Sequence, residues 1–240
     1  MTSKELRSSQ YRRIFYDVYA QTNLTDCLEL RCDAARLLLP PVAVFCDVTA
    51  ARLYGVPVPD QDGRVHAAVP SVSTVVPRIK DLRVHSYAIP PAHLRVRDGR
   101  PLVSPERLFL ELAAGLPRMD LIIAGDHMLR HRLTSRSRLT GFLHDCHRRR
   151  GVGRAKLALP DLDDRSDSPP ETRLRMLIVD AGLPRPVVNR DIVTERGVWL
   201  ARPSDKGNTP QLNGAPQRGR SAWSGGASSE AAFARGCDRT

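Results

Sequence analysis

The stretch SPERLFLELAAG, residues 104–115, marks the point at which the sequence changes in character. Ser104 is a residue type that caps the free N–H groups of a helix start, and Pro105 suits the first helical position. The stretch therefore predicts a helix that ends near Gly115. Segments before it are typical of mixed strands and helices, whereas segments after it are mostly helical, so the sequence predicts an α+β fold.

Residues 1–102, before this helix, are predicted to form a small mixed α/β region. Apolar residues at helical spacing predict a helix over residues 24–39, and a shorter helix over residues 49–54 ends at Gly55. Segments that alternate, or that are rich in β-branched and aromatic residues, predict three strands. These strands are residues 12–19, 65–69 and 82–87.

Residues 103–164 are predicted to be a basic helical region. Two further helices, over residues 120–131 and 135–149, follow the one at 104–115. The chain then enters a third region, residues 165–203, which is predicted to be the start of another domain. There a helix opens at Ser168, and a strand is predicted over residues 185–193.

Residues 204–240 differ in composition from the rest of the chain. They are rich in Gly, Ala, Ser and Arg, and their large apolar side chains are Leu212, Trp223 and Phe233. Three such side chains cannot offset the entropy lost in ordering a segment of this length. The sequence therefore predicts a disordered C-terminal tail.

The charge balance restricts the class of partner. The 240 residues include 37 Lys and Arg against 26 Asp and Glu, a formal net charge of +11. This balance favours a polyanionic partner. The sequence has no apolar run long enough to cross a membrane, no secretory signal and no basic helix with a large aromatic face, so we expect a cytoplasmic protein that binds no membrane. Its five cysteines form no C-x-x-C pair, which argues against a disulfide framework or a cysteine zinc site.

A dense basic run lies between positions 130 and 156, where Asp145 is the one acidic residue. Arginine predominates in it, and the planar guanidinium group suits phosphate oxygens. The run predicts non-specific contact with DNA through phosphate neutralisation. The alternative is a solvated helix face without a partner. The candidate nucleic-acid-binding residues are Arg130, Arg132, Arg136, Arg138, Arg148, Arg149, Arg150, Arg154 and Lys156.

Glu171 is the candidate catalytic carboxylate. It lies one turn before Leu174 on the same helix face, where it could help to hold a hard metal ion. The alternative is structural, because Ser168 and Glu171 have the spacing of a capping box, and spacing alone favours that alternative.

Histidine groups offer weaker candidates for a metal site. His127 and His131 are four residues apart on a predicted helix, but the H-E-x-x-H pattern is absent. His66 and His85 are predicted to be ordinary residues of strands. The sequence also lacks a phosphate-binding Gly-rich loop and a G-x-S-x-G motif, so it does not support a kinase, a GTPase, a dehydrogenase or a hydrolase of the usual types.

Six short motifs, taken in order, resemble a group of actinobacterial proteins. These proteins pair a region similar to AbiEi-type antitoxins with a domain similar to very-short-patch-repair (Vsr-like) endonucleases, and the resemblance covers about residues 4–203. The motifs are YRRIFYDVY (11–19), TAARLYGV (49–56), VSPER (103–107), GDHML (125–129), SPPETRLR (168–175) and AGLPxPxxN (181–189).

The resemblance implies a PD-(D/E)XK, restriction-endonuclease-like core at the C-terminal end. Glu171 matches the glutamate that the first helix of such a core carries, and the carboxylates of the core would hold Mg²⁺. The sequence departs from the pattern after position 203. Ser204 stands where an aspartate is expected, Asp205 is one residue late and would lie on the opposite face of a strand, and no apolar strand follows. We therefore expect an incomplete, inactive nuclease core with no cofactor, and Mg²⁺ only if the protein is an active nuclease.

Three functions remain open from the sequence. The first is a DNA-associated binding protein without catalysis. The second is a Mg²⁺-dependent endonuclease that uses Glu171, together with Asp191 or Asp205. The third is a non-functional remnant of a frameshifted gene.

Two structural expectations follow from the resemblance. Because the sheet of the nuclease core is incomplete, Leu174, Leu177 and Ile178 should be partly exposed. For the same reason, the segment from about residue 165 should be loosely held or covered by self-association. The few residues before position 11 leave no room for the recognition helix of a winged helix-turn-helix, so sequence-specific reading of DNA from this end is not expected. A toxin partner is not identified by the sequence.

Overall fold

The computed structural model describes residues 6, 8–59, 62–70 and 78–187, together with three short strands near the C-terminus. The fold is α+β, as the sequence predicted. The α-helices in the described residues are α2 (Leu28–Arg36), α3 (Asp47–Leu53), α4 (Pro105–Gly115), α5 (Arg118–Arg130), α6 (Arg136–Asp145), α7 (Val152–Ala158) and α8 (Pro169–Asp180). Short 3₁₀ helices lie at Pro91–His93 and Leu159–Asp161.

A five-stranded mixed sheet lies at the centre of the fold, with the strand order β5-β4-β3-β7-β6. The outer pairs differ in direction: β4 runs parallel to β5, and β6 antiparallel to β7. At the centre, β3 pairs antiparallel with β4 and parallel with β7. The strands are β3 (Val44–Phe45), β4 (Val65–Val69), β5 (Leu82–Ser86), β6 (Leu94–Arg97) and β7 (Arg100–Val103).

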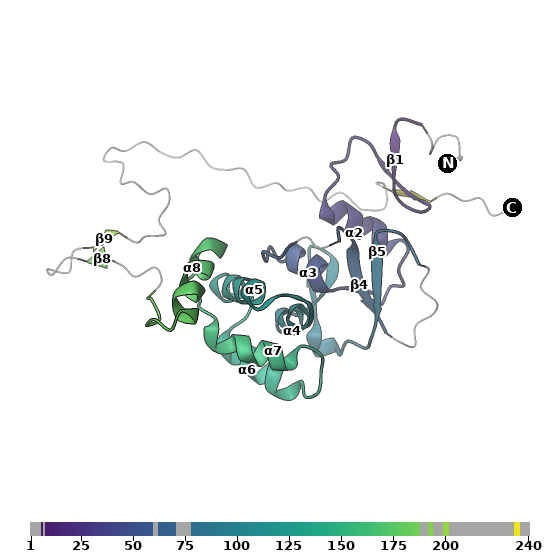
Figure 1. The fold of residues 1–240 in the computed structure, drawn as a ribbon. Helices are drawn as coiled ribbons and strands as arrows, with labels where there is room; N and C mark the ends of the chain where they lie inside the picture. Colours follow the sequence, from purple (N-terminus) through teal and green to yellow (C-terminus); the bar gives the residue numbers. More distant parts are fainter. Residues whose placement is uncertain are drawn as a thin grey trace.

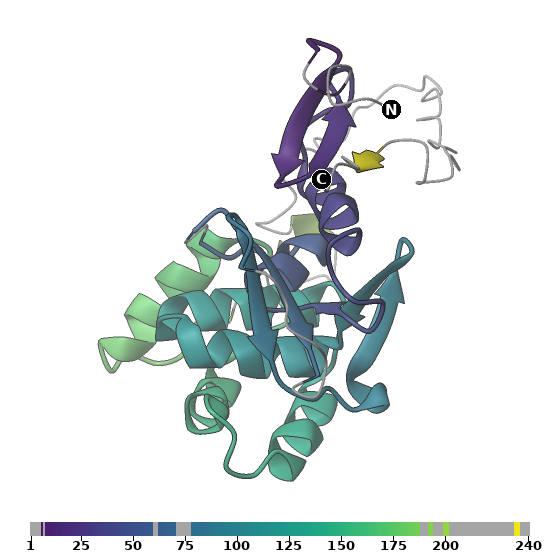
Figure 2. The same cartoon turned by 90° about the vertical axis from the view of Figure 1, so that its right-hand side faces the viewer.

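The N-terminal segment forms a hairpin, β1 (Tyr11–Phe15) and β2 (Val18–Gln21), instead of the single strand predicted over residues 12–19. Asp17 adopts a φ of 61°, and aspartate tolerates this left-handed conformation in turns. Phe15 therefore pairs with Val18 across a two-residue turn. Figures 1 and 2 show the hairpin standing apart from the central sheet, beside α2.

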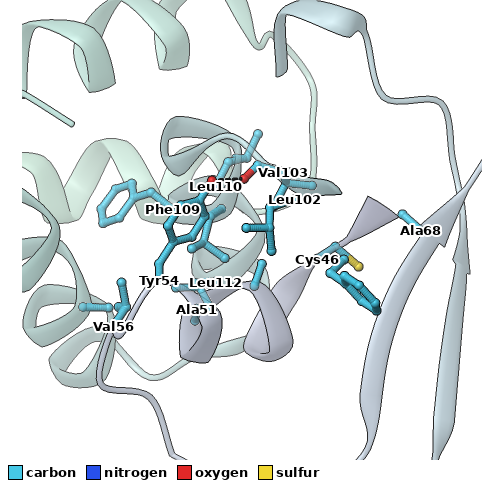
Figure 3. Close-up of a cluster of buried hydrophobic side chains, with 14 of the residues drawn as sticks. Cys46, Ala51, Tyr54, Val56, Ala68, Leu102, Val103, Phe109, Leu110 and Leu112 are labelled. Atoms are coloured by element: carbon cyan, nitrogen blue, oxygen red, sulfur yellow. Dashed lines mark hydrogen bonds between the residues drawn. The ribbon is translucent and has the colours of Figure 1, made fainter. Parts of the chain in front are cut away.

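The helices α4 to α8 lie together on one side of the molecule, and β4 and β5 lie on the other (Figure 1). The helix predicted at residues 104–115 is confirmed: Ser104 accepts a hydrogen bond from the backbone N–H of Arg107. Phe109 and Leu112 of α4 are fully buried, and burial of such a side chain stabilises the fold by about 1.5–3 kcal/mol. Figure 3 shows them beside Tyr54, whose hydroxyl donates to the carbonyl oxygen of Val103 at 3.0 Å. The buried apolar cluster extends without interruption from Phe15 to Met176.

Helix α8 is attached to α5 through a buried ionic network. Arg175 Nη2 lies 2.7 Å from Asp126 Oδ2, and both side chains are almost completely buried. The hydroxyl of Thr172 donates to the same carboxylate oxygen at 2.8 Å, and the backbone N–H of Asp163 donates to Oδ1 at 2.7 Å. Arg175 Nη1 donates to the carbonyl oxygen of Asp161 at 2.6 Å. This network joins α5, α8 and the segment between them.

The outer face of α8 is apolar and exposed. Leu174 and Leu177 have relative accessibilities of 61% and 63%, and Ile178 is half-buried, so the predicted partial exposure of these three side chains is confirmed. The helix is nevertheless not loosely attached, because Thr172, Arg175 and Met176 are buried on its other face.

Two other predictions need correction. The helix predicted over residues 135–149 ends at Asp145, and a separate helix, α7, begins at Val152 after a loop of three arginines. The strand predicted over residues 185–193 is not formed at positions 185–187; β8 comprises Ile192–Val193 and pairs with β9 (Trp199–Ala201). The tail predicted to be disordered lies outside the described residues, except for β10 (Phe233–Arg235), which pairs with β2.

Candidate functional site

A cavity of about 380 Å³ opens between the central sheet, the starts of α3 and α7, and α4. Most of its lining residues have polar or charged side chains. The lining residues are Asp47, His85, Tyr87, Arg107, Leu110, Glu111, Ala114, Arg149 and Arg150. The cavity therefore joins the sheet edge to the basic loop before α7.

Glu111 organises one wall of this cavity. Its Oε1 accepts hydrogen bonds from Arg107 Nε at 2.7 Å and from the Tyr87 hydroxyl at 2.8 Å. Its Oε2 accepts from the backbone N–H of Asp47 at 3.1 Å. The Arg107 guanidinium also lies 4.9 Å from the centre of the Tyr87 ring, and Arg107 Nη1 is buried without a hydrogen-bond partner in the described part of the chain.

Asp47 adopts a φ of 51°, a left-handed conformation at the start of α3. Such a backbone costs about 1–3 kcal/mol and persists where the surroundings enforce it. Here the hydrogen bond from Asp47 N–H to Glu111 holds the residue in place. This backbone conformation, held by the hydrogen bond, thus fixes the position of the Asp47 carboxylate.

His85 of β5 also lines the cavity, and the buried His66 of the neighbouring strand β4 lies next to it. His66 Nδ1 lies 3.4 Å from Asp47 Oδ2 and 3.4 Å from His85 Nε2. His66 Nε2 lies 3.2 Å from Asp62 Oδ1. His66 is buried, whereas Asp47 and His85 are half-buried. The fixed position of His66 follows from β4, where its backbone N–H also donates to Thr49 Oγ1 at 2.8 Å.

The electrostatic environment differs between the two histidines. Burial lowers the pKa of His66, but hydrogen bonds to Asp47 and Asp62 outweigh it, so the pKa is raised. For His85 burial and the nearby His66 lower the pKa. Burial also raises the pKa of Glu111, against the opposing effect of Arg107.

Asp47, His66 and His85 are the one group in the described residues whose arrangement suits a metal ion, with ligand atoms within 4.8 Å of one another. Sequence reasoning missed this group, because it interpreted both histidines as ordinary residues of strands. The register explains their proximity: Ala68 is paired with His85 in the parallel β4–β5 ladder, and His66 lies on the same face of β4 as Ala68.

The predicted basic run is divided by the structure into two sets. Four of its residues contact protein groups: Arg130 pairs with Asp167, Arg138 pairs with Glu106, and Arg136 and Arg154 donate to backbone carbonyl oxygens. The other five are exposed, and none forms an ion pair with a described acidic residue. These five, called the exposed basic set below, are Arg132, Arg148, Arg149, Arg150 and Lys156.

Glu171 lies at the start of α8 and makes local contacts. Its Oε1 accepts a hydrogen bond from the Ser168 hydroxyl and its Oε2 from the backbone N–H of Asp167, both at 3.0 Å. The capping box that the Ser168–Glu171 spacing predicted is not formed, because the Ser168 hydroxyl donates to Glu171 and makes no hydrogen bond to a helix N–H. Glu171 instead holds the segment that leads into α8. Asp191 and Asp205, the other carboxylates considered for a nuclease site, lie outside the described residues.

His127 lies in α5 and His131 directly after it, and their rings are tilted by 33° with their centres 4.1 Å apart. Burial and the neighbouring His131 lower the pKa of His127 to about 4. No third ligating side chain joins this pair among the residues that the structure describes.

Comparison with known proteins gives two relatives in sequence. No protein-family model matches the chain. It is 32% identical over 174 residues to "Uncharacterized protein MT2308" from Mycobacterium tuberculosis strain CDC 1551 / Oshkosh, and equally to "Uncharacterized protein Rv2248" from strain ATCC 25618 / H37Rv. The alignments cover 72% of this chain and 62% of each relative, so the chain spans less than two thirds of the relatives' length.

Among solved structures, the crystal structure of RV2827C protein from Mycobacterium tuberculosis is similar with a TM-score of 0.42 and 16% sequence identity. That similarity covers 71% of this chain and 66% of the other. Every helix in the described part of the chain is too short or too polar to cross a membrane.

Proposed function

We propose that the protein binds DNA without sequence specificity, through the exposed basic set, and that Glu171 has a structural role at the start of α8 and is not a catalytic residue. The observation that supports this most strongly is the loop before α7. Arg148, Arg149 and Arg150 are consecutive, exposed and without an ion pair to any described acidic residue. Three adjacent guanidinium groups suit the phosphates of a nucleic-acid backbone.

The conformation of this loop supports the same proposal. Arg148 has a φ of 60° and Gly151 a φ of 89°, so the chain turns sharply at both ends of the arginine triplet. Gly151 lies directly against the backbone of α4 at Leu110 and Ala114. The triplet is therefore presented from a fixed position on the body of the protein, which reduces the entropy lost on binding.

The structure also narrows the predicted interface. Arg130, Arg136, Arg138 and Arg154 hold other parts of the chain, and their replacement would test the fold as well as binding. The exposed basic set is thus the smaller and better target for substitutions that test DNA binding. We place this binding in the cytoplasm, in accordance with free cysteines at Cys27, Cys32, Cys46 and Cys146.

The expected result is a weaker dependence of DNA affinity on salt when the triplet is removed. Replacing Arg148, Arg149 and Arg150 with serine should reduce the slope of log K against log salt by about 2–3, because each lost phosphate contact contributes about 0.9. The affinity can be measured by fluorescence anisotropy with duplexes of two unrelated sequences. Both duplexes should lose affinity to the same extent.

A matched control removes three exposed basic residues outside the run. Serine at Arg13, Arg78 and Lys80 produces the same change in net charge. If this control weakens binding as much as the triplet variant, the effect is due to net charge alone and the assignment of the interface is wrong.

A separate assay tests the role of Glu171. We expect no nicking of supercoiled plasmid in the presence of Mg²⁺, because the described residues place no group of metal-ligating side chains around Glu171. Cleavage that EDTA abolishes and that is lost in Glu171→Gln would overturn the non-catalytic part of the proposal. The salt-dependence experiment would be unaffected by that outcome.

A further inference from the structure

We propose that Asp47, His66 and His85 form a site for a divalent transition-metal ion, with Zn²⁺ as the preferred ion and one coordination position left open to the cavity. The proposal is independent of DNA binding, because none of the three residues belongs to the exposed basic set. It assigns a role to side chains that sequence reasoning treated as ordinary residues of strands.

Two of the three separations between ligand atoms match a tetrahedral ion, and all three atoms lie within 4.8 Å of one another. His66 Nδ1 lies 3.4 Å from Asp47 Oδ2 and 3.4 Å from His85 Nε2. Two ligands bound about 2.0–2.1 Å from a tetrahedral zinc ion lie about 3.3–3.4 Å apart. The two pairs that include His66 are already at this separation, and one ion is coordinated once the Asp47 and His85 ligand atoms, which lie within 4.8 Å of each other, adopt the same spacing.

A second carboxylate orients the central histidine. Asp62 Oδ1 lies 3.2 Å from His66 Nε2, the ring nitrogen that faces away from the other two ligands. A metal-bound histidine commonly donates its second N–H to such a carboxylate, which fixes the tautomer that leaves the other nitrogen free to ligate. Asp62 thus supplies the outer contact that a histidine–metal site requires.

The surrounding fold holds the first carboxylate in position. The left-handed backbone of Asp47 is secured by its hydrogen bond to Glu111, and Glu111 is itself fixed by Arg107 and Tyr87. The strained backbone conformation of Asp47 places its carboxylate beside His66. A pre-positioned ligand loses less entropy when the ion binds.

The ligand types select the ion. Two imidazole nitrogens and one carboxylate oxygen suit Zn²⁺ or a similar transition metal, whereas Mg²⁺ and Ca²⁺ prefer sites made of oxygen atoms. Three protein ligands leave a fourth position for water or an anion. Because Asp47 and His85 also line the cavity, that position adjoins the positive charges of Arg149 and Arg150.

A second pair of histidines in the same chain can be compared with the candidate metal site. The imidazole rings of His127 and His131 are even closer together, but no third ligating side chain of the described chain joins them. If two neighbouring histidines were enough to bind zinc, the His127–His131 pair and the Asp47–His66–His85 group would both bind it. Only the Asp47–His66–His85 group should bind one ion in tetrahedral geometry.

The test is metal binding by the full chain after treatment with a chelator. Zn²⁺ affinity is measured by competition with a chromophoric chelator, and Co²⁺ is added separately to report geometry through its visible spectrum. We expect one equivalent of tightly bound Zn²⁺ and the intense bands of tetrahedral cobalt. His85→Ala and Asp47→Asn should lose both signals, and Asp62→Asn should weaken Zn²⁺ binding by about 10- to 100-fold.

His127→Ala is the matched control and should leave Zn²⁺ binding and the cobalt spectrum unchanged. Circular dichroism of each variant checks that the fold is retained; the substitutions avoid buried His66 for this reason. The proposal is wrong if the chain binds no stoichiometric Zn²⁺, or if His85→Ala and Asp47→Asn bind it as tightly as the unaltered protein. In that case the group is an ionic network in which a protonated His66 lies between Asp47 and Asp62.

Discussion

Replacing Arg175 with methionine should lower the free energy of unfolding by about 3–5 kcal/mol, because the carboxylate of Asp126 would be left buried without its charge partner. Asp126 and Arg175 are almost completely inaccessible to solvent, and their closest atoms are 2.7 Å apart. The loss should be measured by urea denaturation at neutral pH. A decrease below about 1 kcal/mol would show that the network does not hold α8 in place.

The same helix offers a matched control. Arg173 is exposed and lies 3.7 Å from Asp120, so Arg173→Met should change the free energy of unfolding by at most about 1 kcal/mol. The two substitutions remove the same charge from positions two residues apart. The difference between them therefore isolates the contribution of burial.

The pH dependence of the Arg175→Met variant has a definite sign. Burial already raises the pKa of Asp126, and loss of the guanidinium should raise it further. A carboxyl group whose folded-state pKa is raised contributes stability below its unfolded pKa of about 4, and this contribution is lost as the pH rises through the folded value. The deficit of the variant should therefore shrink as the pH is lowered from 7 towards 4.

Gly151→Ala is the second substitution with a large expected effect, a loss of about 2–5 kcal/mol in the free energy of unfolding. Gly151 has a φ of 89°, which strains any residue that carries a Cβ atom. That atom would also lie 2.8 Å from both Ala114 N and Leu110 O, which are backbone atoms of α4 and cannot rotate away. Either the loop before α7 or the end of α4 must move.

Gly153 provides the comparison for this prediction. It lies inside α7, and a Cβ atom there would meet nothing within 4 Å. Gly153→Ala should therefore be neutral or stabilising by up to about 1 kcal/mol. The free energy of unfolding of both variants can be measured by thermal or urea denaturation. An equal effect at the two positions would contradict the close approach of the loop to α4.

The helices of this protein are largely predictable from local chemistry. Ser104 and Pro105 identify the start of α4, and Gly182, with a φ of 74°, follows the end of α8. These signals act within a few residues and therefore survive in any tertiary context. The predicted length of the helix after Ser135 was wrong, because the turn at Arg148 and Gly151 depends on packing against α4.

The strands were harder to predict. The pair β6–β7 was missed, although Asp98 and Gly99 carry the Asp-Gly signal of a tight hairpin and both have positive φ, 49° and 71°. Here the signal was present in the sequence. In contrast, β3 has only two residues, and nothing local indicates that it lies at the centre of the sheet.

The buried face of α8 and the candidate metal site could not be predicted from local patterns. The sequence predicted that Leu174 and Leu177 are partly exposed, but it did not indicate that the fold buries Thr172 and Arg175, for which Asp126 of α5 supplies a partner. Asp47, His66 and His85 come from one helix start and two strands. Their proximity depends on sheet register, which no short motif encodes.

The position of β3 has a consequence for the order in which the chain can fold. Its second neighbour, β7, is synthesised much later, since Phe45 pairs with Leu102. While the chain emerges from the ribosome, β3 exposes unpaired backbone groups until that later strand and α4 arrive. Pairing between such distant segments slows folding and exposes the nascent chain to aggregation, so ribosome-bound chains that stop short of β7 should depend on chaperones far more than longer ones.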